Sequence, residues 1–241
     1  MTPEATAAAV AAPIGEYGTK FMLDSSFYEG LDKWGYGGFD FYFAGRGGVL
    51  GDGPADATIA AFGFMHPDLV RDMWDAGRAV APVHETVTRF TDRCAEWGRR
   101  HFGESTGLPR LAALAERVVE SADATAAPLF AGWRAVPRPA DAAGATALLL
   151  NCLREHRGGM HLIAVRSVGL TALEAVLANG GEGVARFFGH QPPFPEAAPA
   201  EKTLEAEAIT NQLAAQAYEI LDEGERLEFV DLVSSVRTAI G

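Results

Sequence analysis

The sequence contains few cysteines and few lysines. Its 241 residues include two cysteines, Cys94 and Cys152, too few for a disulfide framework. Lysine occurs three times, and the 20 basic residues are outnumbered by 32 acidic ones, so the formal net charge is −12. A chain with this charge is not attracted non-specifically to nucleic-acid phosphates or anionic lipid. We therefore expect no nucleic-acid partner unless a local basic patch exists.

A long apolar run is also missing. A membrane span requires about 18 consecutive apolar residues, and no segment of the chain approaches this length. Residues 1–13 hold no lysine or arginine ahead of their alanines, whereas a secretory signal peptide begins with positive charge. We expect a cytoplasmic protein without membrane contact.

Alternation of apolar and polar residues between turn signals, which is typical of strands, is not found. Apolar residues recur instead at helical spacing, and their share of 48% suffices for one large domain or two small ones. The predicted fold is all-α, a multi-helix bundle. The predicted helices lie at about 3–12, 13–23, 25–33, 37–46, 55–65, 69–76, 82–101, 109–119, 122–135, 140–168, 171–178, 184–188, 202–221 and 223–239.

Two proline-containing segments divide the predicted helices. Residues 137–139 mark a first linker, and residues 191–200, rich in proline and alanine, mark a second. We expect an N-terminal helical region over 1–136, a central helix over 137–190, and a linker with an acidic helical pair over 191–241. These parts are expected to form one compact unit, and packing of the acidic pair across a homodimer stays open.

An aromatic segment near residue 40 carries the first candidate site. If residues 37–46 are helical, Phe39, Tyr42 and Arg46 share one face. An unpaired guanidinium among aromatic side chains is costly, so Arg46 either pairs with an internal carboxylate or faces an anionic ligand. Both roles stay open. Asp40, Tyr42 and Arg46 are candidate substrate-binding residues.

The central helix carries the second candidate site. On a continuous helix Arg154, Arg157 and His161 fall on one face, whereas His156 falls among apolar residues. A glutamate or histidine buried among apolar neighbours has a shifted pKa, which suits general acid–base catalysis. Glu155, His156 and His161 are therefore candidate catalytic residues, and Arg154 and Arg157 are candidate substrate-binding residues. A satisfied core network, with His156 as a structural histidine, is the alternative.

The histidine spacing does not predict a metal site. His84 and Glu85 open a zinc-binding helical pattern, but Thr88 stands where the second ligand belongs. His156 and His161 are about 140° apart around a helix, so they share an ion only if the helix bends. No motif implies a cofactor, and the cofactor stays unknown, with axial ligation of haem by one histidine as an alternative.

Three segments carry a resemblance to a known family. They are Tyr42–Gly51, Ala60–Val70 and Leu153–His161, and the last is the most specific. In this order they resemble SalK-like proteins, a bacterial family with a helix-turn-helix region, over about Pro13–Val184 and again across the final helices. The resemblance implies a protein that handles a small molecule in secondary metabolism.

The chain departs from the pattern of that family in three places. The resemblance implies a histidine and an aspartate where this chain has Gly15 and Gly159. It also implies a winged-helix segment between Leu177 and Glu207, whereas residues 178–206 are rich in proline and alanine and too few for three helices and a wing. A basic recognition helix is missing from this part of the sequence, which also argues against DNA binding.

Three functional hypotheses follow. In the first, an enzyme or accessory protein acts on a small apolar molecule with an anionic or carbonyl end, which arginines hold while Glu155, His156 or His161 moves a proton. In the second, the pocket senses or sequesters a ligand without chemistry, as in a diverged winged-helix regulator. In the third, the protein binds haem or another pigment.

Overall fold

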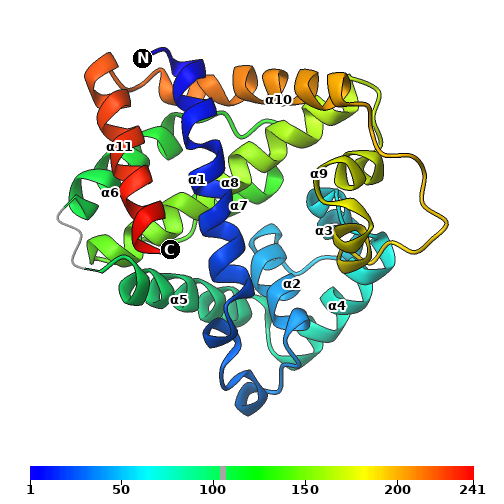
Figure 1. The fold of residues 1–241 in the computed structure, drawn as a ribbon. Coiled ribbons are helices and arrows are strands. Elements are labelled where there is room, and N and C mark those ends of the chain that lie inside the picture. Colours follow the sequence, from blue (N-terminus) through cyan, green and yellow to red (C-terminus); the bar gives the residue numbers. More distant parts are fainter. Residues whose placement is uncertain (104–106) are drawn as a thin grey trace.

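The structure, a computed structural model, describes residues 1–103 and 107–241. Within these residues it contains helices and no strand, which confirms the predicted all-α class (Figure 1). Short 3-10 helices span Ser25–Tyr28, Leu31–Trp34, Gly48–Leu50 and Gln216–Tyr218. The α-helices are α1 (Pro3–Leu23), α2 (Phe39–Gly47), α3 (Ala55–Phe62), α4 (Pro67–Val80), α5 (Val83–His101), α6 (Leu108–Ser121), α7 (Pro128–Arg134), α8 (Ala142–Ser167), α9 (Ala172–Phe187), α10 (Ala200–Ala215) and α11 (Glu223–Ala239).

Helix α8 is the centre of the fold. Asp141 caps its N-terminus by accepting a hydrogen bond from the Gly144 N–H at 2.8 Å. The predicted helix at 140–168 is confirmed, and its backbone stays helical through Gly158 and Gly159. Helices α1, α5, α6, α7 and α10 pack around it. Because these neighbours cover α8 on most sides, polar side chains in its middle are buried.

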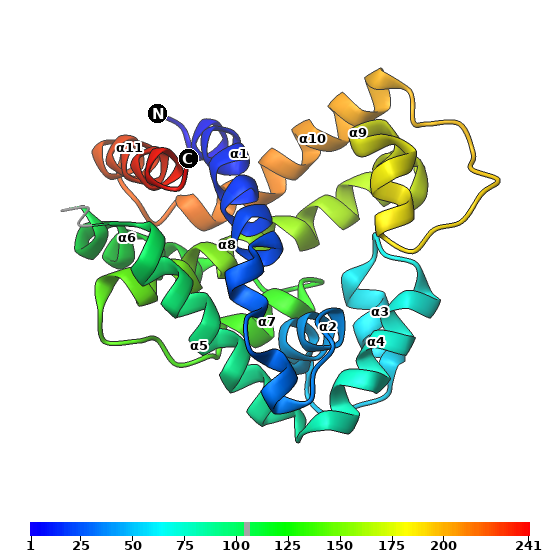
Figure 2. The same ribbon diagram turned by 60° about the horizontal axis from the view of Figure 1, so that its bottom comes forward.

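Helix α1 crosses α8 and lies beside α11 (Figures 1 and 2). The prediction of separate helices at 3–12 and 13–23 is wrong, because α1 continues through Pro13. A proline inside a helix costs about 3 kcal/mol. Tyr17 and Phe21 of α1 are fully buried, and each large buried side chain contributes about 1.5–3 kcal/mol. Tertiary packing therefore outweighs the helix break that proline favours.

Two glycines explain further differences from the predicted helices. The segment predicted as a helix at 25–33 forms two 3-10 helices separated at Gly30, whose φ is +73°. Helix α9 joins the short helices predicted at 171–178 and 184–188 across a kink at Gly181, with φ +66° and ψ −170°. This backbone conformation is open essentially to glycine alone. The kink changes the direction of the helix axis between the first and second halves of α9.

The acidic helical pair packs on its own chain. Helix α10 contacts α1 and α8, and α11 contacts α1 and α6. Helix α11 buries Phe229, Val233 and Val236, whereas Leu213 of α10 and Leu227 of α11 are exposed. The apolar face of α11 is therefore buried against α1 and α6 of the same chain. Packing of the acidic pair across a homodimer stays a prediction.

Helices α8 and α9 are joined by the four residues 168–171 and are bent by 112° relative to each other. Taken together they have the length and apolar composition of an interrupted membrane span, whereas no single helix among the described residues does. The neighbouring helices bury more than half of the side chains of α8.

Candidate ligand-binding site

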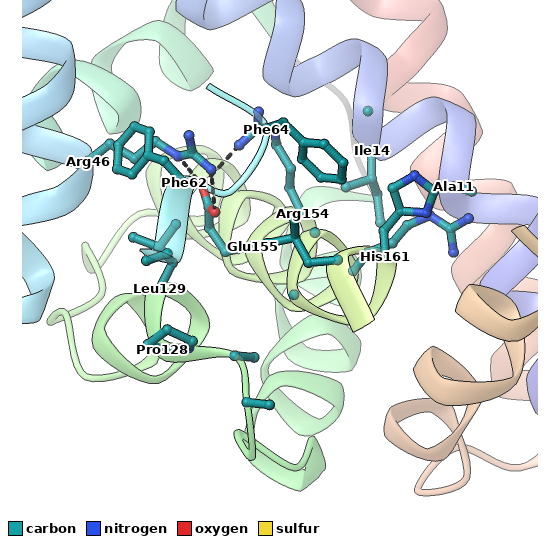
Figure 3. Close-up of a pocket in the computed structure, with 18 of the residues that line it drawn as sticks. Ala11, Ile14, Arg46, Phe62, Phe64, Pro128, Leu129, Arg154, Glu155 and His161 are labelled. Atoms are coloured by element: carbon teal, nitrogen blue, oxygen red, sulfur yellow. Dashed lines mark hydrogen bonds and ion pairs between the residues drawn. The ribbon is translucent and has the colours of Figure 1, made fainter. Parts of the chain in front are cut away.

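A cavity of about 700 Å³ lies beside α8, between α1, α7, α10 and the turn that follows α3 (Figure 3). Five of the predicted site residues line it: Arg46, Arg154, Glu155, Arg157 and His161. The rest of the wall is mostly apolar. It includes Ala11, Ile14, Phe62, Phe64, Pro128 and Leu129.

A buried ion pair forms one wall of this cavity. Arg46, in the last turn of α2, donates from Nε to Oε1 of Glu155 at 2.8 Å and from Nη2 to Oε2 at 2.9 Å. Its Nη1 donates to the Tyr42 hydroxyl at 3.0 Å, and its guanidinium lies 4.3 Å from the centre of the Phe62 ring. Of the two roles left open for Arg46, the structure shows the pairing with an internal carboxylate.

A second arginine shares the same carboxylate. Arg154 donates from Nη1 to Oε1 of Glu155 at 2.9 Å. Burial alone raises the pKa of Glu155, but Arg46 and Arg154 more than reverse this effect, so the net pKa is lowered. Glu155 is therefore an ionised carboxylate and carries no proton to donate at neutral pH. Two guanidinium groups on one carboxylate leave one positive charge in excess.

Arg154 occupies its place because α1 presents a glycine to it. A Cβ atom at Gly18 would lie 2.3 Å from Cδ and 2.4 Å from Nε of Arg154, far inside van der Waals contact. The arginine stem thus lies directly against the α1 backbone. Its Nε and Nη2 have no hydrogen-bond partner among the described residues, and its side chain is 27% exposed.

Arg157 and His161 connect α8 to α10. Arg157 donates to Oδ1 of Asn211 at 2.9 Å and also pairs with Glu207. His161 lies 2.9 Å, measured from Nδ1, from the hydroxyl of Thr210. Burial lowers the pKa of His161, against the opposing effect of Glu207, so the ring is neutral at neutral pH.

The hydrogen bonds of Thr210 assign the tautomer of His161. The Thr210 hydroxyl donates its single proton to the Ala206 carbonyl at 2.7 Å. It must then accept from His161, so the proton of the imidazole resides on Nδ1. Nε2 carries the lone pair and is the basic atom of a ring that lines the cavity.

Asp40 lies outside the cavity. Its carboxylate accepts hydrogen bonds from the N–H groups of Gly37 at 2.9 Å, Gly38 at 2.7 Å and Phe41 at 2.8 Å. The side chain thus pairs the backbone N–H groups at the N-terminus of α2. These backbone bonds leave it no part in the cavity wall.

His156 lies outside the cavity too, on another face of α8. Its ring packs edge-on against Phe130 with 4.9 Å between ring centres, and the residue is 4% exposed. Burial lowers its pKa to about 4, opposed in part by Asp123. The geometry matches the structural histidine that the sequence left as the alternative.

A second, smaller pocket of about 300 Å³ adjoins the cavity. Tyr42 lines this pocket and reaches the cavity only through its bond to Arg46. Thr19 and Arg154 line both spaces, so Arg154 belongs to the wall of each.

The sequence did not indicate three residues that shape the site. Glu207 and Thr210 of α10 hold Arg157 and His161 in place, and Gly18 makes room for Arg154. A helical spacing of three between Glu207 and Thr210 was a usable signal, because it places both side chains on one face of α10. The position of Gly18 beside Arg154 had no signal in the sequence.

The two glycines at which the chain departs from the SalK-like pattern both line the cavity. A Cβ atom at Gly15 would meet nothing within 4 Å, whereas one at Gly159 would lie 2.8 Å from the Ala127 side chain. The cavity thus has room for a side chain at position 15 but not at position 159. Its larger polar groups come from α2, α8 and α10.

Metal binding finds no support in the arrangement of side chains. In residues 1–103 and 107–241 no group of three or more histidine, cysteine, aspartate or glutamate side chains is arranged to hold an ion. The hypothesis of haem ligation by one histidine now concerns His161, the histidine that lines the cavity.

Comparison with known proteins adds a family. Residues 7–193 match the profile described as Helix-turn-helix family. The chain belongs to this helix-turn-helix family. No curated protein and no solved structure matches the chain.

One helix pair within the matched residues has the geometry of a helix-turn-helix unit, in which two helices meet at about 90–120° across a turn of three or four residues. α8 and α9 meet this description with their four-residue turn and their bend of 112°. The second helix of the unit carries one basic residue, Arg186, which pairs with Glu182 at 3.2 Å. After α9, residues 188–199 contain neither helix nor strand.

Proposed function

We propose that this chain binds a small molecule with an anionic or carbonyl end, and that Arg154 holds this end in the cavity. The observation that carries the proposal is the sharing of Glu155 by Arg46 and Arg154. Three buried or half-buried charges with an excess of one positive charge favour an anion at the remaining donors. Those donors are Nε and Nη2 of Arg154.

The other charged residues support this site without contacting the ligand's charged end. Arg46 uses Nε, Nη1 and Nη2 for Glu155 and Tyr42, and Arg157 is held by Glu207 and Asn211. Because each of the three guanidinium nitrogens of Arg46 already donates to Glu155 or Tyr42, Arg46 orients Glu155, and Glu155 in turn orients Arg154. This is the arrangement of a preorganised anion site, in which supporting groups fix the cation that binds.

Proton transfer, in the version of the proposal that makes the chain an enzyme, is carried by His161. Glu155 is ionised and paired, and His156 lies away from the cavity. His161 is neutral, with its lone pair on Nε2, and lines the cavity. It is therefore the general base that this site offers. The resemblance to SalK-like proteins supports a molecule of secondary metabolism as the ligand.

Because the chain belongs to the helix-turn-helix family, DNA is the alternative partner that must be weighed against a small molecule. The α8–α9 unit offers one arginine on its second helix, already paired with Glu182, and the whole chain has a net charge of −12. Phosphate contacts from lysine and arginine provide most of the affinity for DNA. We therefore propose no nucleic-acid partner, and a salt-sensitive shift of duplex DNA in a gel would contradict this.

Binding of hexanoate tests the proposed anion site. Isothermal titration calorimetry should show hexanoate binding at least tenfold more tightly than hexan-1-ol, since a charge-assisted hydrogen bond contributes about 1.5–3 kcal/mol. Arg154→Met should remove this preference while keeping the apolar part of the side chain. Arg100→Met is the matched control, because Arg100 is exposed on α5 and pairs with Glu96. Equal binding of the acid and the alcohol by the native protein would refute the proposal.

A further inference from the structure

The pocket beside the cavity gives the proposed ligand a shape. We infer that the ligand is an elongated amphiphilic carboxylate, with its carboxylate at Arg154 and an apolar body of about ten carbon atoms in the adjoining pocket. This inference rests on the proposed function, because it takes Arg154 as the group that binds the charged end. It adds the chemical class of the ligand and the direction in which it lies.

The walls of the pocket are apolar and largely aromatic. They come from the end of α1, from α2, from the start of α4 and from the second half of α9. Apart from Thr19, Arg154 and the hydroxyls of two tyrosines, the lining side chains carry no polar atom other than methionine sulfur. The Tyr28 hydroxyl donates to the Met22 carbonyl at 2.6 Å and the Tyr42 hydroxyl accepts from Arg46, so each has a partner within the protein. A pocket of this kind selects an apolar body.

Arg154 and Thr19 join the pocket to the cavity. A molecule in the pocket therefore meets a cation where the pocket borders the cavity, and Nε and Nη2 of this cation are unused donors. A neutral apolar molecule would leave the excess positive charge without an anion, and a small hydrophilic anion would leave the aromatic walls in water. A molecule that satisfies both has one carboxylate at the end of an apolar body.

Exposed apolar side chains gather at the mouth of the same pocket. Leu23 is 58% exposed, Phe39 42%, Val184 37% and Phe187 47%, and all four line it. The rings of Phe39 and Phe187 meet edge to face with 5.6 Å between their centres. Clustered exposure of this kind marks a surface that a ligand or partner covers. The cation in the wall of the pocket, Arg154, favours a ligand with a negative charge as the occupant.

The size of the pocket limits the length of the apolar body. A volume of about 300 Å³ holds about ten non-hydrogen atoms, if each takes the ~30 Å³ of a molecule in liquid water. Straight-chain acids of six to twelve carbons therefore bracket the expected ligand.

A chain-length series tests the inference directly. Hexanoate, octanoate, decanoate and dodecanoate are titrated into the native protein below the concentrations at which they form micelles. Each added methylene should tighten binding about fourfold, as burial of one CH₂ group does, until the pocket is full near ten carbons. From there to dodecanoate the affinity should level off. Decan-1-ol should bind at least tenfold more weakly than decanoate.

Two exposed phenylalanines supply a variant that does not threaten the fold. In the Phe39→Ala and Phe187→Ala double variant, decanoate should bind at least tenfold more weakly, and the gain from hexanoate to decanoate should shrink. Leu227→Ala, which removes an exposed apolar side chain from α11, should leave the whole series unchanged. Dependence on Arg154 with no dependence on chain length would overturn this inference and leave the proposed function intact. Dependence on chain length with equal binding of acid and alcohol would overturn both.

Discussion

Arg46 and Glu155 lie 109 residues apart in the chain and meet in two hydrogen bonds, of 2.8 and 2.9 Å, at the wall of the cavity. Both side chains are buried, so the two charges are compensated by protein groups rather than by bulk water. The pair connects α2, which carries the aromatic segment, to the central helix α8. The cavity therefore has a wall whose charge is set by contacts between distant parts of the sequence.

Removing one partner of this pair should destabilise the protein strongly. In Arg46→Met the buried carboxylate of Glu155 keeps only Arg154, and we expect the free energy of unfolding to fall by about 3–5 kcal/mol. In the double variant with Glu155→Leu most of this loss should be regained, because the one charge left without its partner, Arg154, is 27% exposed and can be hydrated. Urea unfolding at pH 7 measures both. A double variant as unstable as the single one would show that the pair stabilises the fold directly.

The buried histidine His156 should make stability depend on pH. Its pKa is about 4 in the folded protein, below the value of about 6.5 in an unfolded chain. Between these values the unfolded chain binds the extra proton, so the contribution of His156 to the free energy of unfolding is complete above pH 6.5 and falls as the pH drops from 6.5 to 4. This contribution amounts to about 3 kcal/mol.

Comparison with His156→Leu isolates this contribution, since the other titrating groups remain in both proteins. Urea unfolding of the two proteins between pH 4.5 and 7.5 should show the native protein losing stability relative to the variant steadily as the pH falls. Parallel curves over this range would mean that His156 titrates alike in the folded and unfolded chain.

A methyl group at Gly18 should act on ligand binding rather than on stability. In Gly18→Ala the new Cβ atom would lie 2.3 Å from Cδ of Arg154, and the flexible arginine must move. Alanine inside a helix is about 0.5–1 kcal/mol more favourable than glycine, so unfolding should not become easier. Hexanoate binding should weaken about tenfold with loss of one charge-assisted hydrogen bond.

Gly15→Ala is the matched control for this substitution. It lies on the same helix and the same cavity, but its Cβ atom meets nothing within 4 Å. It should keep both the native affinity for hexanoate and the small gain in helix stability. Equal losses of affinity in the two variants would contradict the role given to the contact between Gly18 and Arg154.

A buried amide in α8 should be replaceable with a gain in stability. Asn151 is fully buried, and neither its Oδ1 nor its Nδ2 has a hydrogen-bond partner among the described residues. Asn151→Leu removes two unsatisfied polar atoms at similar volume and should raise the free energy of unfolding by about 1–3 kcal/mol. The Oδ1 atom of Asn211 accepts a hydrogen bond from Arg157, so Asn211→Leu should lower the free energy of unfolding. Destabilisation by Asn151→Leu would refute this assignment.

Local spacing is enough to predict the main features of α8. Its length, and the placement of Arg154, Arg157 and His161 on one face with His156 on another, follow from helical geometry, and the structure shows both. These are properties of a single helix and do not depend on what packs against it. The all-α class is a sum of such local patterns.

Contacts between distant segments are beyond the reach of local patterns. Nothing in the aromatic segment indicates that the carboxylate paired with Arg46 is Glu155, or that Gly18 borders Arg154. A carboxylate that binds backbone N–H groups at a helix start and one that binds a ligand look the same in sequence, and Asp40 accepts bonds from the N–H groups at the start of α2. The helix break predicted at Pro13 is wrong because local propensity does not include the burial of α1.

The cavity wall is assembled from residues of α1, α2, α3, α7, α8, α9 and α10, and these segments come together only in the folded chain. An unfolded chain therefore has no site, and by thermodynamic linkage any molecule that occupies the cavity must raise the melting temperature. At a concentration of one hundred times Kd the gain is about 2.7 kcal/mol. A thermal-shift screen of small carboxylic acids thus reports binding before the ligand is identified, because the stability of the fold is the measured quantity.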